Sequence, residues 1–450
     1  MLNVAVALVC RAKYLILESK LGRRFARGAF WNLAGSIGAR VLGTISSIIM
    51  ARMLGANAYG GIGIIQTTIG ALGLFAGLSL GLTATKYVAE LRNHHADRAG
   101  RVIALSELSA WVSSTIMAVG LLASSNWLCS HALGAPQLIT AFKIGAFLLV
   151  LGAVTNVQNG ALVGLEAFRA NSMSNLLTAV SSLPVAIAMT YVWGLHGAVW
   201  ALVINLAISF VMKFAYLRRE SRLAGVPIKL QGSAAEATAL WRFSLPAVAG
   251  GVLGSPINWF CTALLVAQPN GLAEMALFTA ANQWRTAVLF VPNNVGSVAL
   301  PLLANLQGEG SHRTHRTLAL ASAGTAALLA AIAAIPIIIG SQYLMGAYGS
   351  AFAGGGKVLV ILSTVAVIQS TNDVLWQALI SKGRVYILLF SNAVWGISVL
   401  VVYLWAIPQR TAASLSSALL VGFTIQCIFN MYFLIQNQPA SSVHYEVSLE

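Results

Sequence analysis

The chain has 450 residues, of which 58% are hydrophobic and only 9% are charged. Because a soluble globular protein carries roughly 25% charged residues, this composition excludes a soluble domain and indicates a membrane protein. The formal net charge of +15 is also found in proteins that bind nucleic acid, so the positions of the charges along the chain have to decide between the two interpretations.

The apolar residues form segments that are long enough to cross a bilayer, since a spanning helix needs about 20 mostly apolar residues. In chain order, the twelve predicted spans cover approximately residues 28–52, 58–86, 102–125, 138–163, 173–193, 196–217, 241–267, 271–301, 317–340, 354–381, 385–406 and 412–436. The sequence therefore predicts an all-α polytopic membrane protein with about 12 transmembrane helices.

The residues before the first span contain a short apolar run, "LNVAVALVC" from Leu2 to Cys10. This run resembles a signal peptide, but no basic region precedes it and its apolar core is short. We interpret residues 1–22 as an interfacial helix or a frayed leader, within a predicted cytoplasmic or interfacial segment that covers residues 1–26.

Basic residues gather on alternate connections between the predicted spans. If the N-terminus is cytoplasmic, the cytoplasmic segments hold 21 of the 27 Lys and Arg residues, which is the positive-inside bias of membrane proteins. These residues are Arg11, Lys13, Lys20, Arg23, Arg24, Arg27, Lys86, Arg92, Arg98, Arg101, Arg169, Lys213, Arg218, Arg219, Arg222, Lys229, Arg242, Arg313, Arg316, Lys382 and Arg384. The bias predicts that both termini are cytoplasmic, and it explains the net charge without nucleic acid.

The order of the spans divides the chain into two halves. The stretches that start at Arg27 and at Arg242 both run from a basic anchor through a Gly-rich span and a short turn into another span. We predict an N-terminal half at 27–217, a basic cytoplasmic linker at 218–240, a C-terminal half at 241–437 and a cytoplasmic tail at 438–450. Two parallel six-helix halves place a substrate site in a central cavity between them, near the midplane of the bilayer.

The connections and motifs do not indicate an enzyme. The longest predicted outer connection, at about 126–137, carries no formal charge, and the sequence has no Walker A loop, no H-E-x-x-H and no G-x-S-x-G motif. The four cysteines are far apart, so neither a disulfide framework nor a zinc site is indicated: Cys10, Cys129, Cys261 and Cys427. These features favour a transporter over a polymerase, ligase or glycosyltransferase, and we expect no catalytic residue, no metal and no cofactor.

Two stretches of the first half carry a family resemblance. One is "RGAFWNLAGSIGARVLGTISSIIMARMLGANAYGGIGIIQTTIGALGLFAGLSLGLTATKYVAEL" from Arg27, with an "LG…YG" turn at residues 54–60 and the basic loop "KYVAELRNHHADRAGR". The other is "LVGLEAFRANSMSNLL", which leads into the fifth span. In these stretches the chain resembles the Wzx-type flippases of polysaccharide biosynthesis, within the multidrug/oligosaccharidyl-lipid/polysaccharide exporter (MOP) superfamily. The second half matches this family mainly by its pattern of spans.

This resemblance implies a substrate and a location. The family moves oligosaccharide repeat units, carried on undecaprenyl pyrophosphate, from the inner to the outer leaflet of the bacterial inner membrane by alternating access. The product serves the assembly of surface polysaccharide, such as O-antigen or exopolysaccharide. A polysaccharide polymerase and a chain-length regulator are the protein partners that this role implies, and no nucleic acid is involved.

Two arginines lie near the middle of predicted spans. An unpaired arginine at the bilayer centre costs about 2.5–3.5 kcal/mol even on a lenient insertion scale, so Arg40 in the first span and Arg285 in the eighth need a reason. At about 100° per residue, Ser36 shares a helix face with Arg40, and Asn282 and Asn293 share one with Arg285. We expect these five residues to line one polar cavity that binds the anionic part of the substrate.

Three further polar residues lie on one face of the tenth span, namely Gln369, Asp373 and Gln377, and we predict a coupling or gating role for them. If Arg285 is within reach, Asp373 forms a pair with it that opens and closes during transport. If no arginine is near, Asp373 carries a proton or a sodium ion across the membrane. A static brace between Arg285 and Asp373 is a third interpretation.

Other basic residues near span ends leave two readings open. Arg52 either joins the substrate-binding site or extends to the interface, which is what we expect of Lys143 and Lys357. Because the sequence has no nucleotide-binding motif, an ion gradient or downstream polymerisation remains as the energy source.

Two other functions compete with the polysaccharide flippase. A lipid II flippase of peptidoglycan synthesis also has an arginine-lined cavity, but that family usually has two additional C-terminal spans. A cation-coupled drug exporter of the same superfamily binds cations with acidic residues, whereas the predicted interior here is net positive.

Overall fold

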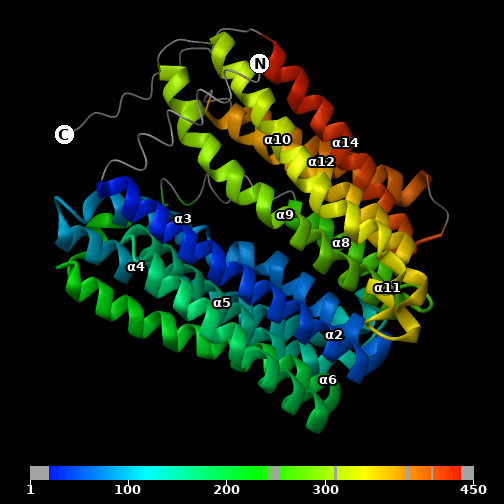
Figure 1. Cartoon of the computed structure of the whole chain (residues 1–450). Helices are drawn as coiled ribbons and strands as arrows, with labels where there is room; N and C mark the ends of the chain where they lie inside the picture. Colours follow the sequence, from blue (N-terminus) through cyan, green and yellow to red (C-terminus); the bar gives the residue numbers. More distant parts are fainter. Residues whose placement is uncertain are drawn as a thin grey trace. The chain divides into compact units, whose positions relative to one another are not determined.

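The computed structural model describes residues 20–238, 240–241, 244, 254–308, 312–381, 385–406 and 409–436. These residues form helices and connections without a strand, and eight of the helical segments among them are long and apolar enough to cross a membrane. The predicted all-α membrane fold is therefore confirmed. The helices belong to two compact units, coloured by sequence in Figure 1, and each unit is described by itself.

Unit 1 contains the described residues up to 54, 68–129 and 136–244. Its helices are α2 (Lys20–Gly77), α3 (Leu80–Leu91), α4 (Ala96–Trp127), α5 (Ile139–Gly164) and α6 (Phe168–Leu223). The central helix is α5, because it packs against α3, α4 and α6. Buried apolar side chains at these contacts, such as Ile103, Val157 and Leu217, form the core of the unit.

Two of the helical segments are longer than one span because a glycine interrupts each of them. In α2 the break is at Gly55 (φ 73°), inside the predicted turn between the first two spans. In α6 the break is at Gly194 (φ 54°), and a Cβ on Gly197 would lie 1.8 Å from the carbonyl oxygen of Met189. A continuous helix would separate these two residues by about 12 Å, so the chain reverses at Gly194. Each segment therefore covers two predicted spans.

The second predicted span, 58–86, is wrong in one respect because it is not continuous. Leu78 and Ser79 have positive φ angles of 45° and 53°, and α3 begins only at Leu80. The hydroxyl of Ser113 on α4 donates to the carbonyl oxygen of Ala76 at 2.6 Å. A hydrogen bond from a neighbouring helix thus satisfies a carbonyl at the end of α2, which makes the interruption tolerable at membrane depth.

Unit 2 contains residues 55–67, 130–135 and the described residues from 254 onward. Its helices are α8 (Gly254–Val266), α9 (Gly271–Gly308), α10 (His312–Ile339), α11 (Ser341–Gly346), α12 (Gly356–Ser381), α13 (Val385–Val401) and α14 (Ala412–Ile435). The central helix of this unit is α12, which packs against α9, α10 and α14.

The second glycine of the "LG…YG" turn has a packing role within unit 2. A Cβ on Gly60 would lie 1.8 Å from the carbonyl oxygen of Leu272 on α9, so only glycine allows this contact. The ring of Tyr59 packs beside those of Tyr348 and Phe352, with centroids 6.2 and 5.8 Å apart. The turn is thus fixed by backbone contact and aromatic packing.

The predicted linker is attached to unit 1 along its length. α6 continues to Leu223, past the predicted span end at 217. Val226 is buried in a core cluster with residues of α3, α4, α5 and α6, and a Cβ on Gly100 of α4 would lie 1.9 Å from the carbonyl oxygen of Pro227. The linker therefore lies directly on the start of α4.

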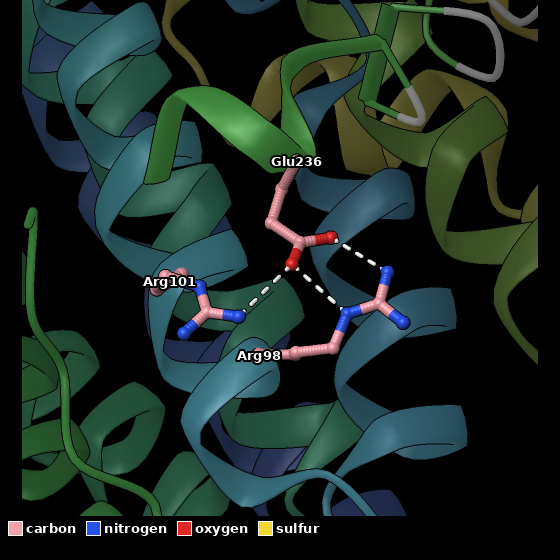
Figure 2. Close-up of polar contacts among 3 residues, drawn as sticks. All are labelled: Arg98, Arg101 and Glu236. Atoms are coloured by element: carbon pink, nitrogen blue, oxygen red, sulfur yellow. Dashed lines mark hydrogen bonds and ion pairs between the residues drawn. The ribbon is translucent and has the colours of Figure 1, made fainter. Parts of the chain in front are cut away.

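A carboxylate holds the far end of the linker (Figure 2). Glu236 accepts hydrogen bonds from Nε and Nη2 of Arg98 at 2.9 and 3.0 Å and from Nη2 of Arg101 at 3.4 Å. The hydrogen bond from Arg98 is the main reason that the pKa of Glu236 lies below its usual value. Because this contact is bidentate and the carboxylate of Glu236 is nearly buried, we expect it to contribute more to stability than a surface ion pair does.

Candidate functional site

Arg285 lies on α9 and reaches α12. Its Nε donates to Oδ1 of Asn282 at 2.9 Å, and its Nη1 donates to Oε1 of Gln369 on α12 at 3.2 Å. Both acceptors are neutral amides, so they orient the guanidinium without neutralising it. The two contacts use only part of the donors of a guanidinium, and the remaining N–H groups make no hydrogen bond within the described residues.

Asp373 follows Gln369 by one helical turn on α12. It lies close enough to Arg285 for the two charges to interact, but they do not form a direct ion pair, unlike Arg98 and Glu236. The geometry therefore places an acid beside the arginine without closing a static brace. A guanidinium can bind an anion with two oxygens through a pair of hydrogen bonds.

Two buried polar atoms next to this pair have no hydrogen-bond partner among the described residues. They are Oε1 of Gln377, one turn beyond Asp373, and Nε1 of Trp284, which precedes Arg285. Such atoms are rare in proteins unless a ligand or water completes them. Asn293 lies farther along α9 and is exposed. We name Asn282, Arg285, Gln369, Asp373 and Gln377 the α9/α12 site.

A network of side-chain amides holds α12 against α13 and α14. Nδ2 of Asn372 donates to Oε1 of Gln426 at 2.9 Å, Nε2 of Gln426 donates to Oδ1 of Asn392 at 3.1 Å, and Nδ2 of Asn430 donates to Oδ1 of Asn372 at 2.7 Å. These bonds join α12 to α13 and α14, and they fix the rotation of α12 that turns Gln369 toward Arg285. Sequence reasoning missed this network, although amides in the middle of apolar spans were a visible signal.

The predicted site residues of the N-terminal half lie on α2 in unit 1. Arg40 is half-buried and Arg52 is exposed, while the side chain of Ser36 lies outside the described residues. The helix start packs closely on α6, since a Cβ on Gly35 would lie 3.3 Å from Cβ of Ser172. Because Arg40 and Arg285 belong to different units, their convergence on one cavity stays a prediction.

The positive-inside count includes Lys213, which also falls in the predicted span 196–217, and the structure places it in a helix rather than in a loop. Lys213 lies inside α6, only 7% exposed, and its Nζ donates to Oδ1 of Asn159 on α5 at 3.3 Å. The signal was present, because the apolar and aromatic residues Phe214, Tyr216 and Leu217 continue the helix beyond it. Because Lys213 was counted with the arginines that follow it as a cytoplasmic charge, its burial was not predicted.

The family model for polysaccharide biosynthesis proteins matches residues 25–307, which is more than half of the chain. The chain belongs to the polysaccharide biosynthesis protein family. The relationship predicted from the sequence, with Wzx-type flippases of the MOP superfamily, is thereby confirmed.

Two curated relatives are identical to this chain at about a quarter of the aligned positions. The EPS I polysaccharide export inner membrane protein EpsE of Ralstonia nicotianae is 24% identical over 80% of this chain and 82% of its own. The succinoglycan biosynthesis transport protein ExoT of Rhizobium meliloti is 24% identical over 75% of this chain and 65% of its own. Together with the apolar helices, these relatives confirm a multi-pass protein of the inner membrane.

Solved structures show the same fold at low identity. A MATE-family multidrug resistance transporter of the MOP superfamily, in an inward-facing conformation, aligns with a TM-score of 0.75 at 15% identity over 88% of this chain and 93% of its own. An MOP superfamily transporter from Pyrococcus furiosus, reported to have a binding pocket of reverse polarity, aligns with a TM-score of 0.70 at 15% identity over 93% of this chain and 96% of its own. At such identities the likeness concerns the fold alone.

Within the described part of the chain, no group of three His, Cys, Asp or Glu side chains is placed to hold a metal ion, and Cys129, Cys261 and Cys427 are free thiols. Cys10 lies outside the described residues.

Proposed function

We propose that this polysaccharide biosynthesis protein is a flippase that moves undecaprenyl-pyrophosphate-linked oligosaccharides from the inner to the outer leaflet by alternating access. The observation that carries the proposal is Arg285, a half-buried arginine that donates to Asn282 and Gln369 and has further donors left for a ligand. A pyrophosphate offers paired oxygens that match a guanidinium. The names of EpsE and ExoT, which are export and transport proteins of polysaccharides, point to the same substrate class.

In this proposal Asp373 couples binding to a second event. A carboxylate beside Arg285 competes with the substrate for the arginine, so pyrophosphate binding releases Asp373. A released carboxylate inside a membrane protein favours uptake of a proton or a sodium ion. Ion release toward the other side of the membrane then restores the pair, which links the gradient to the transport cycle.

The alternative functions receive less support. A drug exporter would require a cation site, but the amides and N–H donors around Arg285 favour an anion. A lipid II flippase would share the pyrophosphate chemistry, so only the glycan distinguishes it from the proposed function. The names of the curated relatives concern exopolysaccharides and favour an oligosaccharide repeat unit.

The test is transport by purified protein in proteoliposomes with fluorescent polyprenyl-pyrophosphate-linked oligosaccharides. We expect the wild type to move the substrate between leaflets, and Arg285→Ala and Arg40→Ala each to lower the initial rate by about a hundredfold, because loss of a buried charged partner costs roughly 2–5 kcal/mol. Arg222→Ala is the matched control, since Arg222 is exposed near the end of α6 and its loss should have little effect. Normal transport by both cavity variants would contradict the proposal.

A further inference from the structure

Unit 1 holds a buried cation that the α9/α12 site does not use. Lys213 lies ten residues before the end of α6 at Leu223, which corresponds to about 15 Å along the helix. Its side chain is almost fully buried between α6 and α5. A lysine near a helix end can extend its amine to the interface, but the amine of Lys213 is directed to Asn159 on α5 instead.

The amine of Lys213 lacks a counterion within the described part of the chain. Ion pairs among the described residues of unit 1 include those of Arg92 with Glu166 and of Arg98 and Arg101 with Glu236, and Lys213 takes part in none of these. Lys213 donates instead to the neutral amide of Asn159. An ammonium has more donors than this one contact uses, and a buried charge without a counterion is unfavourable.

A half-buried acid on the neighbouring helix α4 does not supply a counterion for Lys213. Glu107 on α4 lies near Gln158 and Arg218, and it forms no ion pair with Lys213. Both side-chain polar atoms of Gln158 are buried without a hydrogen-bond partner among the described residues. The helices around Lys213 therefore contain buried hydrogen-bonding atoms that no neighbouring side chain satisfies.

The part of α5 beside Lys213 has a polar open face. Asn156 is exposed and Asn159 is half-buried, and they lie one turn apart on neighbouring positions of the helix surface. Phe147, 54% exposed, precedes Asn156 by nine residues and so lies on the opposite face at about 100° per residue. α5 thus has an apolar open face toward one end and a polar open face toward the other, as expected when the first contacts lipid and the second contacts water or substrate.

Close backbone packing holds the two asparagines in place. A Cβ on Gly160 would lie 2.0 Å from the carbonyl oxygen of Gly81 on α3, and a Cβ on Gly81 would lie 2.9 Å from Oδ1 of Asn156. The hydroxyl of Thr85 on α3 donates to the carbonyl oxygen of Gly160 at 3.1 Å. The asparagines therefore sit on a rigid helix crossing, which suits a binding site.

From this arrangement we propose that Lys213, Asn159 and Asn156 form a second anion-binding site, which takes an acidic oxygen group of the transported molecule. The inference rests on the proposed function for the identity of that molecule. Lys213 supplies the charge and the two amides supply neutral hydrogen bonds. The acidic group is either a phosphate of the lipid carrier or a carboxylate of an acidic sugar, since both present the same anionic oxygens.

The experiment compares Lys213→Met, which keeps the length of the side chain and removes its charge, with Lys143→Met. Lys143 is an exposed lysine of α5 and serves as the matched control. Both variants are assayed in proteoliposomes with two pyrophosphate-linked oligosaccharides, one neutral and one containing a uronic acid. We expect Lys213→Met to lower the rate by about tenfold, which corresponds to one lost charged contact, while Lys143→Met stays near the wild type.

The two substrates separate the two sources of the anion. A loss with both substrates assigns the site to the phosphate, and a loss with the uronic acid substrate alone assigns it to the sugar. Equal rates for Lys213→Met and Lys143→Met with both substrates would overturn the proposal. A lowered melting temperature of Lys213→Met with an unchanged KM would also overturn it, because Lys213 would then act as a brace between α5 and α6.

A binding measurement keeps this test separate from the proposed function. Short-chain polyprenyl pyrophosphate and free glucuronate are each added to detergent-purified protein, and the shift in melting temperature is recorded. At least one of them should raise the melting temperature of the wild type and of Lys143→Met, and that shift should be lost in Lys213→Met. If the wild type transports nothing, the proposed function fails while this difference still tests the anion site. Identical shifts in all three proteins would overturn the site alone.

Discussion

Each of the two units is built around one central helix. The two helices differ in the charge of the polar residue at the corresponding position. Each is organised around a central helix of 26 residues, α5 in unit 1 and α12 in unit 2. Counted from Ile139 and from Gly356, the eighteenth residue of the two helices is Asn156 and Asp373. In unit 1 Lys213 donates to the amide of Asn159, one turn beyond Asn156, and in unit 2 the carboxylate of Asp373 itself interacts with Arg285.

The residue beside each cation decides whether the charge of that unit can change. Lys213 has an amide neighbour that cannot ionise, so no acid beside it changes the charge of its unit. Arg285 has a carboxylate neighbour, so the positive character of its unit depends on whether Asp373 is charged. We infer that unit 2 provides the attraction for anions that a neighbouring acid adjusts, and that unit 1 provides one without such an acid.

The largest expected effect tests the fork geometry of Arg285. Arg285→Lys keeps the charge but cannot hold Asn282 and Gln369 while also binding two oxygens of a ligand. We expect the transport rate to fall by about thirtyfold, equivalent to about 2 kcal/mol. Gln369→Met, which removes only one neutral hydrogen bond, should lower it by about fivefold. Equal rates for Arg285→Lys and the wild type would mean that Arg285 acts as a point charge, as we propose for Lys213.

The next effect tests whether unit 2 is adjustable. Asp373→Asn makes its centre resemble that of unit 1, with a cation and an amide. We expect about a tenfold lower rate under an imposed pH or sodium gradient, and a rate that no longer responds to the gradient. Initial rates in vesicles with and without the gradient measure this response. A full response in the variant would remove Asp373 from the coupling role.

The reverse exchange is expected to have a smaller effect. Asn156→Asp places a carboxylate on the open face of α5, one turn from the partner of Lys213. It should weaken binding of acidic substrates by about threefold through repulsion and competition for the amine, with the KM rising and the maximal rate unchanged. Asn156→Ser, which removes the amide without adding charge, is the control. A lower KM in Asn156→Asp would contradict the assignment of an anion site.

The smallest effect concerns the linker of unit 1. Glu236→Gln keeps the shape of the contact with Arg98 and Arg101 but removes its charge, so we expect the free energy of unfolding at pH 7 to fall by about 1 kcal/mol. Because the pKa of Glu236 is lowered in the folded protein, this contribution is complete above the unfolded pKa of about 4.3. It is lost as the pH falls through the folded value.

Melting curves of the wild type and Glu236→Gln at several pH values test the linker. The difference between the two should be largest near pH 7 and should close below about pH 4. Glu220→Gln, which changes an acid on α6 outside this cluster, is the matched control. A difference between the wild type and Glu236→Gln that grows toward low pH would contradict the assigned contact.

The sequence by itself determined the features that depend on local pattern. The lengths of the apolar runs predicted an all-α membrane fold, and the "LG…YG" turn and the basic loop identified the family. Gly55 lies where the helix is interrupted, and Gly60 lies at a close backbone contact. Both positions need glycine for a local reason, so the motif was visible in the sequence. Arg285 and Asp373 were also visible, because a charge in an apolar run is conspicuous in any sequence.

Only the tertiary structure decided which charges meet which partners. Arg285 and Gln369 are 84 residues apart, and Lys213 and Asn159 are 54 apart, so no local pattern relates them. The charge count grouped Lys213 with the cytoplasmic basic residues that follow it, whereas the folded helices bury its side chain and direct its amine to Asn159. Burial and pairing are properties of the environment built by several helices, and for that reason the site of unit 1 became apparent only in the folded protein.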